Sequence, residues 1–151
     1  MIRAAVLGSP ISHSLSPTLH NRAYEILGIS GKYEAIELSE VEFPQFFAEA
    51  TALDASVDWR GFSLTMPLKE IVTNSLIGVD PLAKRISSAN TILIDRNSQE
   101  VNVKILSTDV LGFRTIFDRI IKCLLVKTFY EDFYYKRCNF SIIHNLFKIF
   151  C

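Results

Sequence analysis

The chain has 151 residues, of which 49% are hydrophobic, and its 16 basic and 16 acidic side chains give a formal net charge of zero. This length suits one globular domain with a real core and is too short for two ordinary ones. A balanced charge without long runs of one sign argues against binding to nucleic acid and against capture by an anionic membrane.

Two sequence features indicate the location of the protein and the state of its cysteines. The early apolar run at residues 4–7 is too short for a signal peptide or a membrane span, so we expect a cytoplasmic protein. The cysteines are odd in number and widely spaced, which fits neither a disulfide framework nor a metal site. We therefore expect no metal and three free thiols, at Cys123, Cys138 and Cys151.

Apolar periodicity predicts strands and helices that alternate along the chain. Strands are expected at residues 4–7, 32–38, 59–65, 89–95 and 101–106. Helices are expected at residues 18–27, 39–53, 67–76, 80–86 and 109–124, and Ser39 with Glu42 has the spacing of a capping box. The last two strands form a hairpin. This order predicts an α/β fold, a three-layer sandwich in which helices flank a mostly parallel mixed sheet.

A polar loop at residues 8–17 joins the first strand to the first helix. Ser16 is a good N-cap, and Pro17 suits the first helical position. The N–H groups and the dipole at a helix start favour an anion, and the hydroxyls of Ser14 and Ser16 add donors for a carboxylate. The alternative is a serine-rich turn that only caps a helix.

Three further polar motifs stand at the ends of predicted strands, where α/β sheets bind ligands. Thr65 and Lys69 lie between a strand and the next helix, Asn90 lies near the start of another strand, and Asp109 follows the last one. In the simplest interpretation the lysine is solvated, the asparagine begins a strand and the aspartate caps a helix.

Together these motifs resemble a known family. Residues 8–21 follow the pattern G-x-P-I-x-H-S-x-S-P-x-x-H-N. This pattern resembles the substrate-binding signature of shikimate dehydrogenases, NADP-dependent enzymes that reduce 3-dehydroshikimate to shikimate in the biosynthesis of chorismate and aromatic amino acids. Residues 65–69 resemble the family's T-x-P-x-K, residues 88–91 its N-T motif and residues 107–112 its N-T-D-x-x-G. Four motifs in the right order make a chance match improbable.

The resemblance implies a catalytic pair, Lys69 and Asp109. A protonated lysine can supply the proton that a developing alkoxide needs, and a carboxylate can orient it. It also implies a substrate site in which serines hold the carboxylate of shikimate or 3-dehydroshikimate while threonine and asparagine hold ring hydroxyls. The residues expected in that site are Ser14, Ser16, Thr65, Lys69, Asn90 and Asp109.

Two departures from the family pattern limit the expectation. Ser107 stands where the family usually has asparagine, and no glycine follows Gly112, although an NADP-binding domain needs a glycine-rich turn. We therefore expect residues 1–126 to form the substrate-binding domain, with no cofactor-binding residue in this chain. The family's NADP dependence remains, but the chain alone should not turn over substrate.

Residues 127–151 differ in character, because they hold eight of the seventeen aromatic residues and no glycine or proline. They are interpreted either as a packed or interfacial helix or as out-of-frame translation of AT-rich DNA. Three alternatives for the function stay open: a quinate or shikimate dehydrogenase, a stand-alone module that binds shikimate without catalysis, and a broken gene product. The sequence predicts no particular oligomeric state.

Overall fold

The computed structural model describes residues 1–76 and 78–135 of the chain, with side chains described as far as residue 124 apart from residue 75. The chain divides into two compact units, Met1–Val110 and Leu111–Cys151. The first unit contains all the strands of the described residues. Much of the aromatic tail, whose nature the sequence left open, lies outside the described residues.

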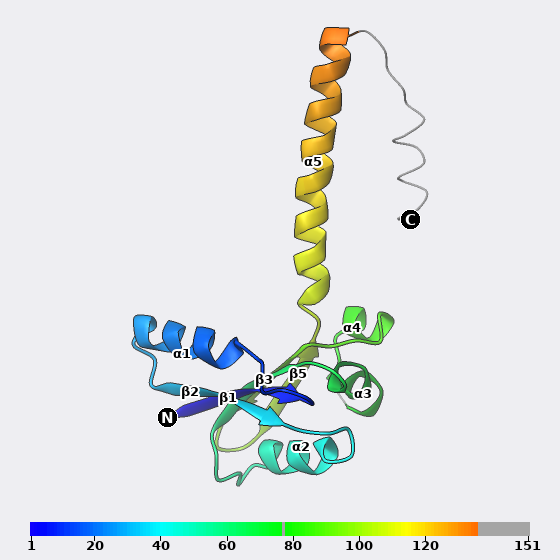
Figure 1. Ribbon diagram of the computed structural model, residues 1–151. Helices are drawn as coiled ribbons and strands as arrows, with labels where there is room; N and C mark the ends of the chain where they lie inside the picture. Colours follow the sequence, from blue (N-terminus) through cyan, green and yellow to red (C-terminus); the bar gives the residue numbers. More distant parts are fainter. Residues whose placement is uncertain (77, 136–151) are drawn as a thin grey trace. The chain divides into compact units, whose positions relative to one another are not determined.

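A five-stranded sheet forms the centre of the first unit (Figure 1). Its strands are β1 (Ile2–Gly8), β2 (Gly31–Glu37), β3 (Trp59–Leu64), β4 (Thr91–Arg96) and β5 (Val101–Leu106), in the order β2-β1-β3-β4-β5. Strand β1 pairs in parallel with β2 and β3, whereas β4 is antiparallel to both of its neighbours. The predicted mixed, mostly parallel sheet is therefore confirmed, with β4 as its antiparallel member.

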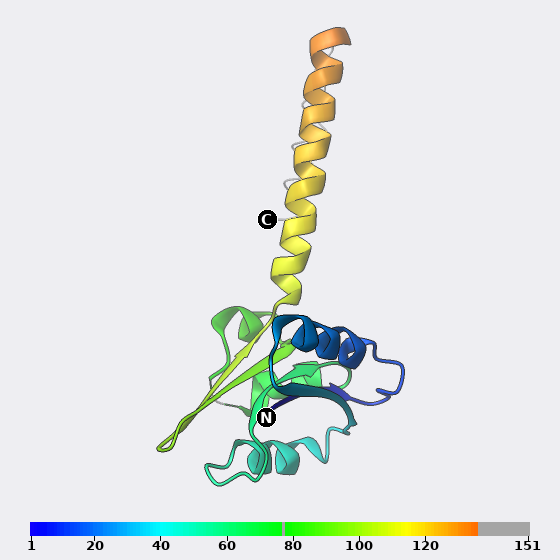
Figure 2. The ribbon, with the colours of Figure 1, turned by 90° about the vertical axis from the view of Figure 1, so that its left-hand side faces the viewer.

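Helices cover both faces of this sheet. The helices between the strands are α1 (Ser16–Leu27), α2 (Phe43–Thr51), α3 (Leu68–Ser75) and α4 (Pro81–Arg85). A further helix, α5 (Asp109–Tyr135), begins after β5. Figures 1 and 2 show α1 and α2 on opposite faces of the sheet. This arrangement confirms the predicted α/β sandwich, and the described residues include the expected helices in every interval between strands except the β4–β5 hairpin, where none was expected.

The two faces of the sheet are packed unequally. Side chains alternate along a strand, so Ala5 and Leu7 of β1 join a large core beneath α2 and α3, while Val6 points to the α1 face. On that second face the buried hydrophobic residues form a small cluster of Val6, Ile11 and Tyr33, and α1 itself has no buried residue. The α1 face is thus thinly covered near the ends of β1 and β3.

The predicted start of α1 is wrong in one respect. Ser16 is the first residue of the helix, and the N-cap position falls on Leu15, which has a helical backbone and makes no side-chain cap. Ser14 supplies the local contact instead, because its Oγ accepts a hydrogen bond from the Ser16 backbone N–H at 3.3 Å. The proline at the helix start is as expected.

The capping box before α2 is formed. The backbone N–H of Ser39 donates to Oε2 of Glu42 at 3.0 Å, and the Glu42 N–H donates back to Oγ of Ser39 at 3.4 Å. The hydrogen bonds from Ser39 lower the pKa of the Glu42 carboxyl. The helix itself is shorter than expected, so Val41 and Leu53 lie outside it and are 89% and 53% exposed rather than on its apolar face.

Arg96 ties the hairpin to the end of α2. Its Nη2 donates to the carbonyl of Ala50 at 2.7 Å, and its Nη1 donates to the carbonyl of Ala52. Carbonyls at a helix end have no partner within the helix, so the guanidinium satisfies them. We expect the substitution Arg96→Met, which keeps an apolar stem, to lower the free energy of unfolding by about 1–3 kcal/mol.

Urea denaturation followed by circular dichroism measures this loss. The matched control is Arg60→Met, because Arg60 pairs with Asp58 at 2.9 Å on the surface, where both side chains are well exposed. Exposed ion pairs contribute little, so the control should change stability by less than about 1 kcal/mol. Equal effects of the two substitutions would contradict the role given to Arg96.

Candidate active site

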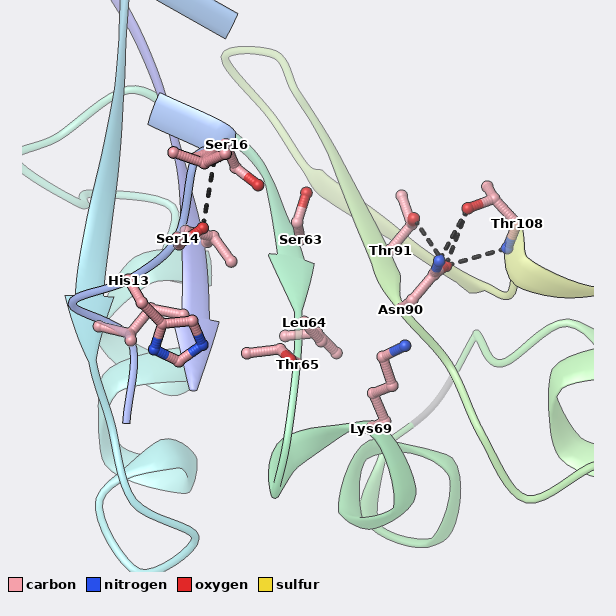
Figure 3. A pocket seen from close by; sticks show the side chains of 13 residues that line it. His13, Ser14, Ser16, Ser63, Leu64, Thr65, Lys69, Asn90, Thr91 and Thr108 are labelled. Atoms are coloured by element: carbon pink, nitrogen blue, oxygen red, sulfur yellow. Dashed lines mark hydrogen bonds between the residues drawn. The ribbon is translucent and has the colours of Figure 1, made fainter. Parts of the chain in front are cut away.

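A cavity of about 440 Å³ opens where β1 and β3 end, on the α1 side of the sheet. Figure 3 shows side chains from the loop after β1 on one side of it and side chains from α3 and the start of β4 on the other. The residues that line it are Val6, Ile11, His13, Ser14, Leu15, Ser16, Ser63, Leu64, Thr65, Lys69, Asn90, Thr91 and Thr108. Five of the six residues expected in a substrate site are among them.

The remaining expected residue, Asp109, reaches the cavity through Lys69. Lys69 lies in the first turn of α3 and Asp109 at the start of α5, and the Lys69 Nζ donates to the Asp109 Oδ2 at 2.7 Å. The two side chains are 31% and 42% exposed, so water reaches the pair. An ammonium has three N–H donors and this bond uses one of them. The lysine is therefore held by an ion pair at the wall of the cavity and keeps two N–H donors for other partners.

Asn90 reaches the same edge of the sheet by a different route. It precedes β4, so it stands at the amino end of its strand, whereas Thr65 and Asp109 follow the carboxyl ends of theirs. Because β4 runs antiparallel to β3 and β5, its amino end lies beside their carboxyl ends. Asn90 thus stands at the start of its strand, as expected, and the reversed direction of β4 brings it to the other two residues.

The Asn90 amide holds the second oxygen of Asp109. Its Nδ2 donates to the Asp109 Oδ1 at 2.7 Å and to the Thr108 Oγ1 at 2.8 Å. Its Oδ1 accepts from the Thr108 backbone N–H at 2.9 Å and from the Thr91 hydroxyl at 3.0 Å. Both carboxylate oxygens of Asp109 are thus fixed, one by an ammonium and one by an amide, and a ligand hydroxyl that binds Asn90 must share or replace one of these bonds.

Sequence reasoning gave no role to several pocket residues. Ser63 accepts a hydrogen bond at its Oγ from the Tyr33 hydroxyl at 2.7 Å, and burial raises the pKa of that tyrosine. Strand alternation places Ser63 on the same face as Thr65, which is a signal that the sequence contains.

Ser107, the departure from the family pattern, is buried, and its hydroxyl has no hydrogen-bond partner among the described residues.

The described glycines do not offer a cradle for the pyrophosphate of a dinucleotide. Gly8 is the one that ends a strand before a loop and a helix, but a Cβ placed on it would meet Thr65 and the Met66 carbonyl. Its backbone is packed against protein and is not open to a phosphate. The described residues therefore do not fit NADP.

Other expectations concern metals, thiols and membranes. In the described part of the chain, no group of three or more metal-ligating side chains is found, and no helix is long and apolar enough to cross a bilayer. Cys123 is a free, exposed thiol, while Cys138 and Cys151 lie outside the described residues.

Fold and pocket together define an α/β domain with a polar cavity at one edge of its sheet, lined in part by a lysine that is paired with an aspartate. The family model described as the shikimate dehydrogenase substrate binding domain matches residues 6–92. The chain therefore belongs to the shikimate dehydrogenase family.

Relatives and solved structures agree with this membership. The chain is 43% identical over 93 residues to shikimate dehydrogenase (NADP(+)) of Thermus thermophilus, covering 62% of this chain and 34% of the relative. It is 41% identical over 88 residues to the enzyme of the same name from an Exiguobacterium species, covering 58% of this chain and 32% of the relative. A crystal structure of the Thermus thermophilus enzyme in complex with NADP(H) and shikimate superposes with a TM-score of 0.64 at 37% identity, over 79% of this chain and 42% of that one. The chain thus matches about a third of the length of these curated relatives.

Proposed function

We propose that residues 1–126 form the substrate-binding domain of an NADP-dependent shikimate dehydrogenase, and that the cavity binds shikimate and 3-dehydroshikimate. The observation that carries this proposal is the Lys69–Asp109 ion pair, at 2.7 Å, whose lysine lines a cavity with serine hydroxyls on its other side. A volume of about 440 Å³ lies in the range of small-ligand pockets and suits a compact polar acid.

The cavity has separate places for the two ends of such an acid. Ser14 and Ser16 stand at the start of α1, where the helix dipole favours a carboxylate. Thr65 and Asn90 lie toward Lys69 and carry polar groups suited to ring hydroxyls. With the carboxylate at α1, the reacting oxygen of the ring lies at the ammonium.

The chemistry assigned to this chain is proton transfer. When a ketone is reduced to an alcohol, the carbonyl oxygen becomes an alkoxide that needs a proton, and the Lys69 Nζ supplies it. Asp109 holds that ammonium and, itself fixed by Asn90, keeps it aimed at the reacting oxygen. The family's reductant is NADPH, which supplies the hydride of the reduction and which the described residues do not fit.

Isothermal titration calorimetry of the purified chain with shikimate tests the proposal. We expect saturable binding with a Kd on the order of 1 mM or tighter, and a loss of about tenfold in Ser16→Ala because a hydrogen bond to a charged group is removed. The control Ser98→Ala changes an exposed serine of the hairpin loop and should bind as the parent does.

The absence of shikimate binding would contradict the proposal. Preferential binding of quinate over shikimate would assign the site to the related acid. The chain alone should not oxidise shikimate with NADP, and turnover by the purified chain would contradict that expectation.

A further inference from the structure

His20 and Asn21 end the first motif, but neither lines the cavity. Both of them contact Tyr33 on the neighbouring strand β2. The Asn21 Nδ2 donates to the Tyr33 carbonyl at 2.9 Å, and the Asn21 Oδ1 accepts from the Tyr33 N–H at 2.8 Å. The His20 ring stacks on the Tyr33 ring, with centroids 4.1 Å apart and planes 6° from parallel. Backbone and ring of this tyrosine are therefore both fixed by α1.

The two hydrogen bonds from Asn21 take the place of those that a further neighbouring strand would make. Strand β2 is at the edge of the sheet and pairs only with β1 among the described strands, so one side of its backbone has no strand neighbour. At Tyr33 the Asn21 side chain satisfies the donor and the acceptor on that open side. A two-bond contact of this kind specifies the register of Tyr33 against α1 more closely than apolar packing would.

From this anchored position Tyr33 reaches across β1 to β3. Its side chain packs with Val6 and Ile11 and is only 4% exposed, and its hydroxyl donates to the Ser63 Oγ at 2.7 Å. Ala4, the partner of Tyr33 in the β1–β2 register, is small enough to leave room for the ring on that face. The phenol thus reaches Ser63, which lines the cavity, from two strands away.

The direction of this hydrogen bond determines what Ser63 can do. A serine hydroxyl has one proton and two acceptor lone pairs, so an Oγ that accepts from Tyr33 directs its own proton elsewhere. Ser63 lines the cavity, and Figure 3 shows its side chain pointing toward the same part of the cavity as Ser16. A hydroxyl that already accepts a hydrogen bond is also a better donor, because chained hydrogen bonds polarise one another.

We propose that Tyr33 is a positioning residue that orients Ser63, so that the Ser63 hydroxyl is a third donor to the substrate carboxylate beside the serines of the loop after β1. This inference rests on the proposed function, since it names the group that meets one end of the same substrate. It also gives a reason why His20 and Asn21 belong to the first motif although neither of them lines the cavity.

The test compares binding of shikimate with binding of its uncharged methyl ester, by calorimetry, in four forms of the chain. These are the parent, Tyr33→Phe, Ser63→Ala and the double variant. We expect Kd for shikimate to rise about tenfold in Ser63→Ala and about fivefold in Tyr33→Phe, with the double variant no weaker than Ser63→Ala, because Tyr33 acts through Ser63. For the ester, all four Kd values should agree within about twofold, since a neutral ester loses less when one donor is removed.

A matched control is Tyr24→Phe, which removes a hydroxyl from the other tyrosine that meets the His20 ring. Its Kd for shikimate should equal that of the parent. Circular dichroism confirms that each variant is folded. Should Tyr33→Phe not fold, His20→Ala takes its place, because it removes the ring that stacks on Tyr33. A loss of acid binding in His20→Ala that disappears when Ser63 is also replaced by alanine supports the proposal, and an unchanged Kd in His20→Ala contradicts it.

Three results overturn the inference in distinguishable ways. An unchanged Kd in Tyr33→Phe, or losses that multiply in the double variant, would show that Tyr33 does not act through Ser63. Equal losses for acid and ester would show that Ser63 does not meet the carboxylate. If the parent binds neither compound, the proposed function fails and this inference fails with it.

Discussion

The substitution Gly8→Ala is expected to weaken shikimate binding by at least about 100-fold. A Cβ at Gly8 would lie 2.4 Å from the Thr65 Cγ2 and 2.7 Å from the Met66 carbonyl oxygen. The second of these is backbone, and the Ser9 N–H bonds to that same carbonyl at 3.0 Å. The segment after β3 must therefore move, and it carries both Thr65 and the helix that presents Lys69.

Calorimetry with shikimate and thermal unfolding by circular dichroism separate the loss of the site from a loss of stability. The matched control is Gly28→Ala, because Gly28 has a left-handed backbone (φ 66°) and no atom within 4 Å of an added Cβ. Strain at that position should cost about 1 kcal/mol of stability without moving the pocket. Retention of binding within threefold in folded Gly8→Ala would show that the two strand ends do not set the geometry of the site.

Local patterns in the sequence were enough to predict the sheet and its helices. Alternation in residues 32–38 and 101–106 predicted strands, and the structure has β2 at Gly31–Glu37 and β5 at Val101–Leu106. The rule that ligands gather beyond strand ends then placed Thr65 and Asp109 near each other. That step needs only the order and direction of the strands, and the alternation of strands and helices along the chain already restricts both.

Features that depend on distant partners were beyond the sequence. Ser16 has the residue type of an N-cap, but the helical backbone of Leu15 displaces the cap position by one residue. Asn90 meets Asp109 because β4 is reversed, and strand direction is decided by pairing across the sheet. The bond from Tyr33 to Ser63 spans two strands, so no spacing along the chain predicts it.

The second large effect is expected when the Lys69–Asp109 ion pair is broken, and a double variant tests whether the two residues act together. In Lys69→Met we expect shikimate binding to weaken by about 10- to 100-fold, because a charged donor to a ring oxygen is lost and the Asp109 carboxylate then faces the cavity without its cation. In the double variant with Asp109→Asn the loss should be smaller than the product of the two single losses, since the uncompensated charge is removed as well.

The matched control for charge is Lys32→Met. Lys32 pairs with Glu34 at 2.8 Å on β2, does not line the cavity, and its loss changes the net charge of the chain by the same amount. Because exposed charges act weakly at a distance in salt, this control should alter Kd by less than about twofold at 0.15 M ionic strength. Calorimetry at that ionic strength decides between the two interpretations of Lys69. Equal losses in Lys69→Met and Lys32→Met would mean that Lys69 acts only through net charge. A loss confined to Lys69→Met, and only partly relieved by Asp109→Asn, would mean that the Lys69 ammonium also contacts the ligand.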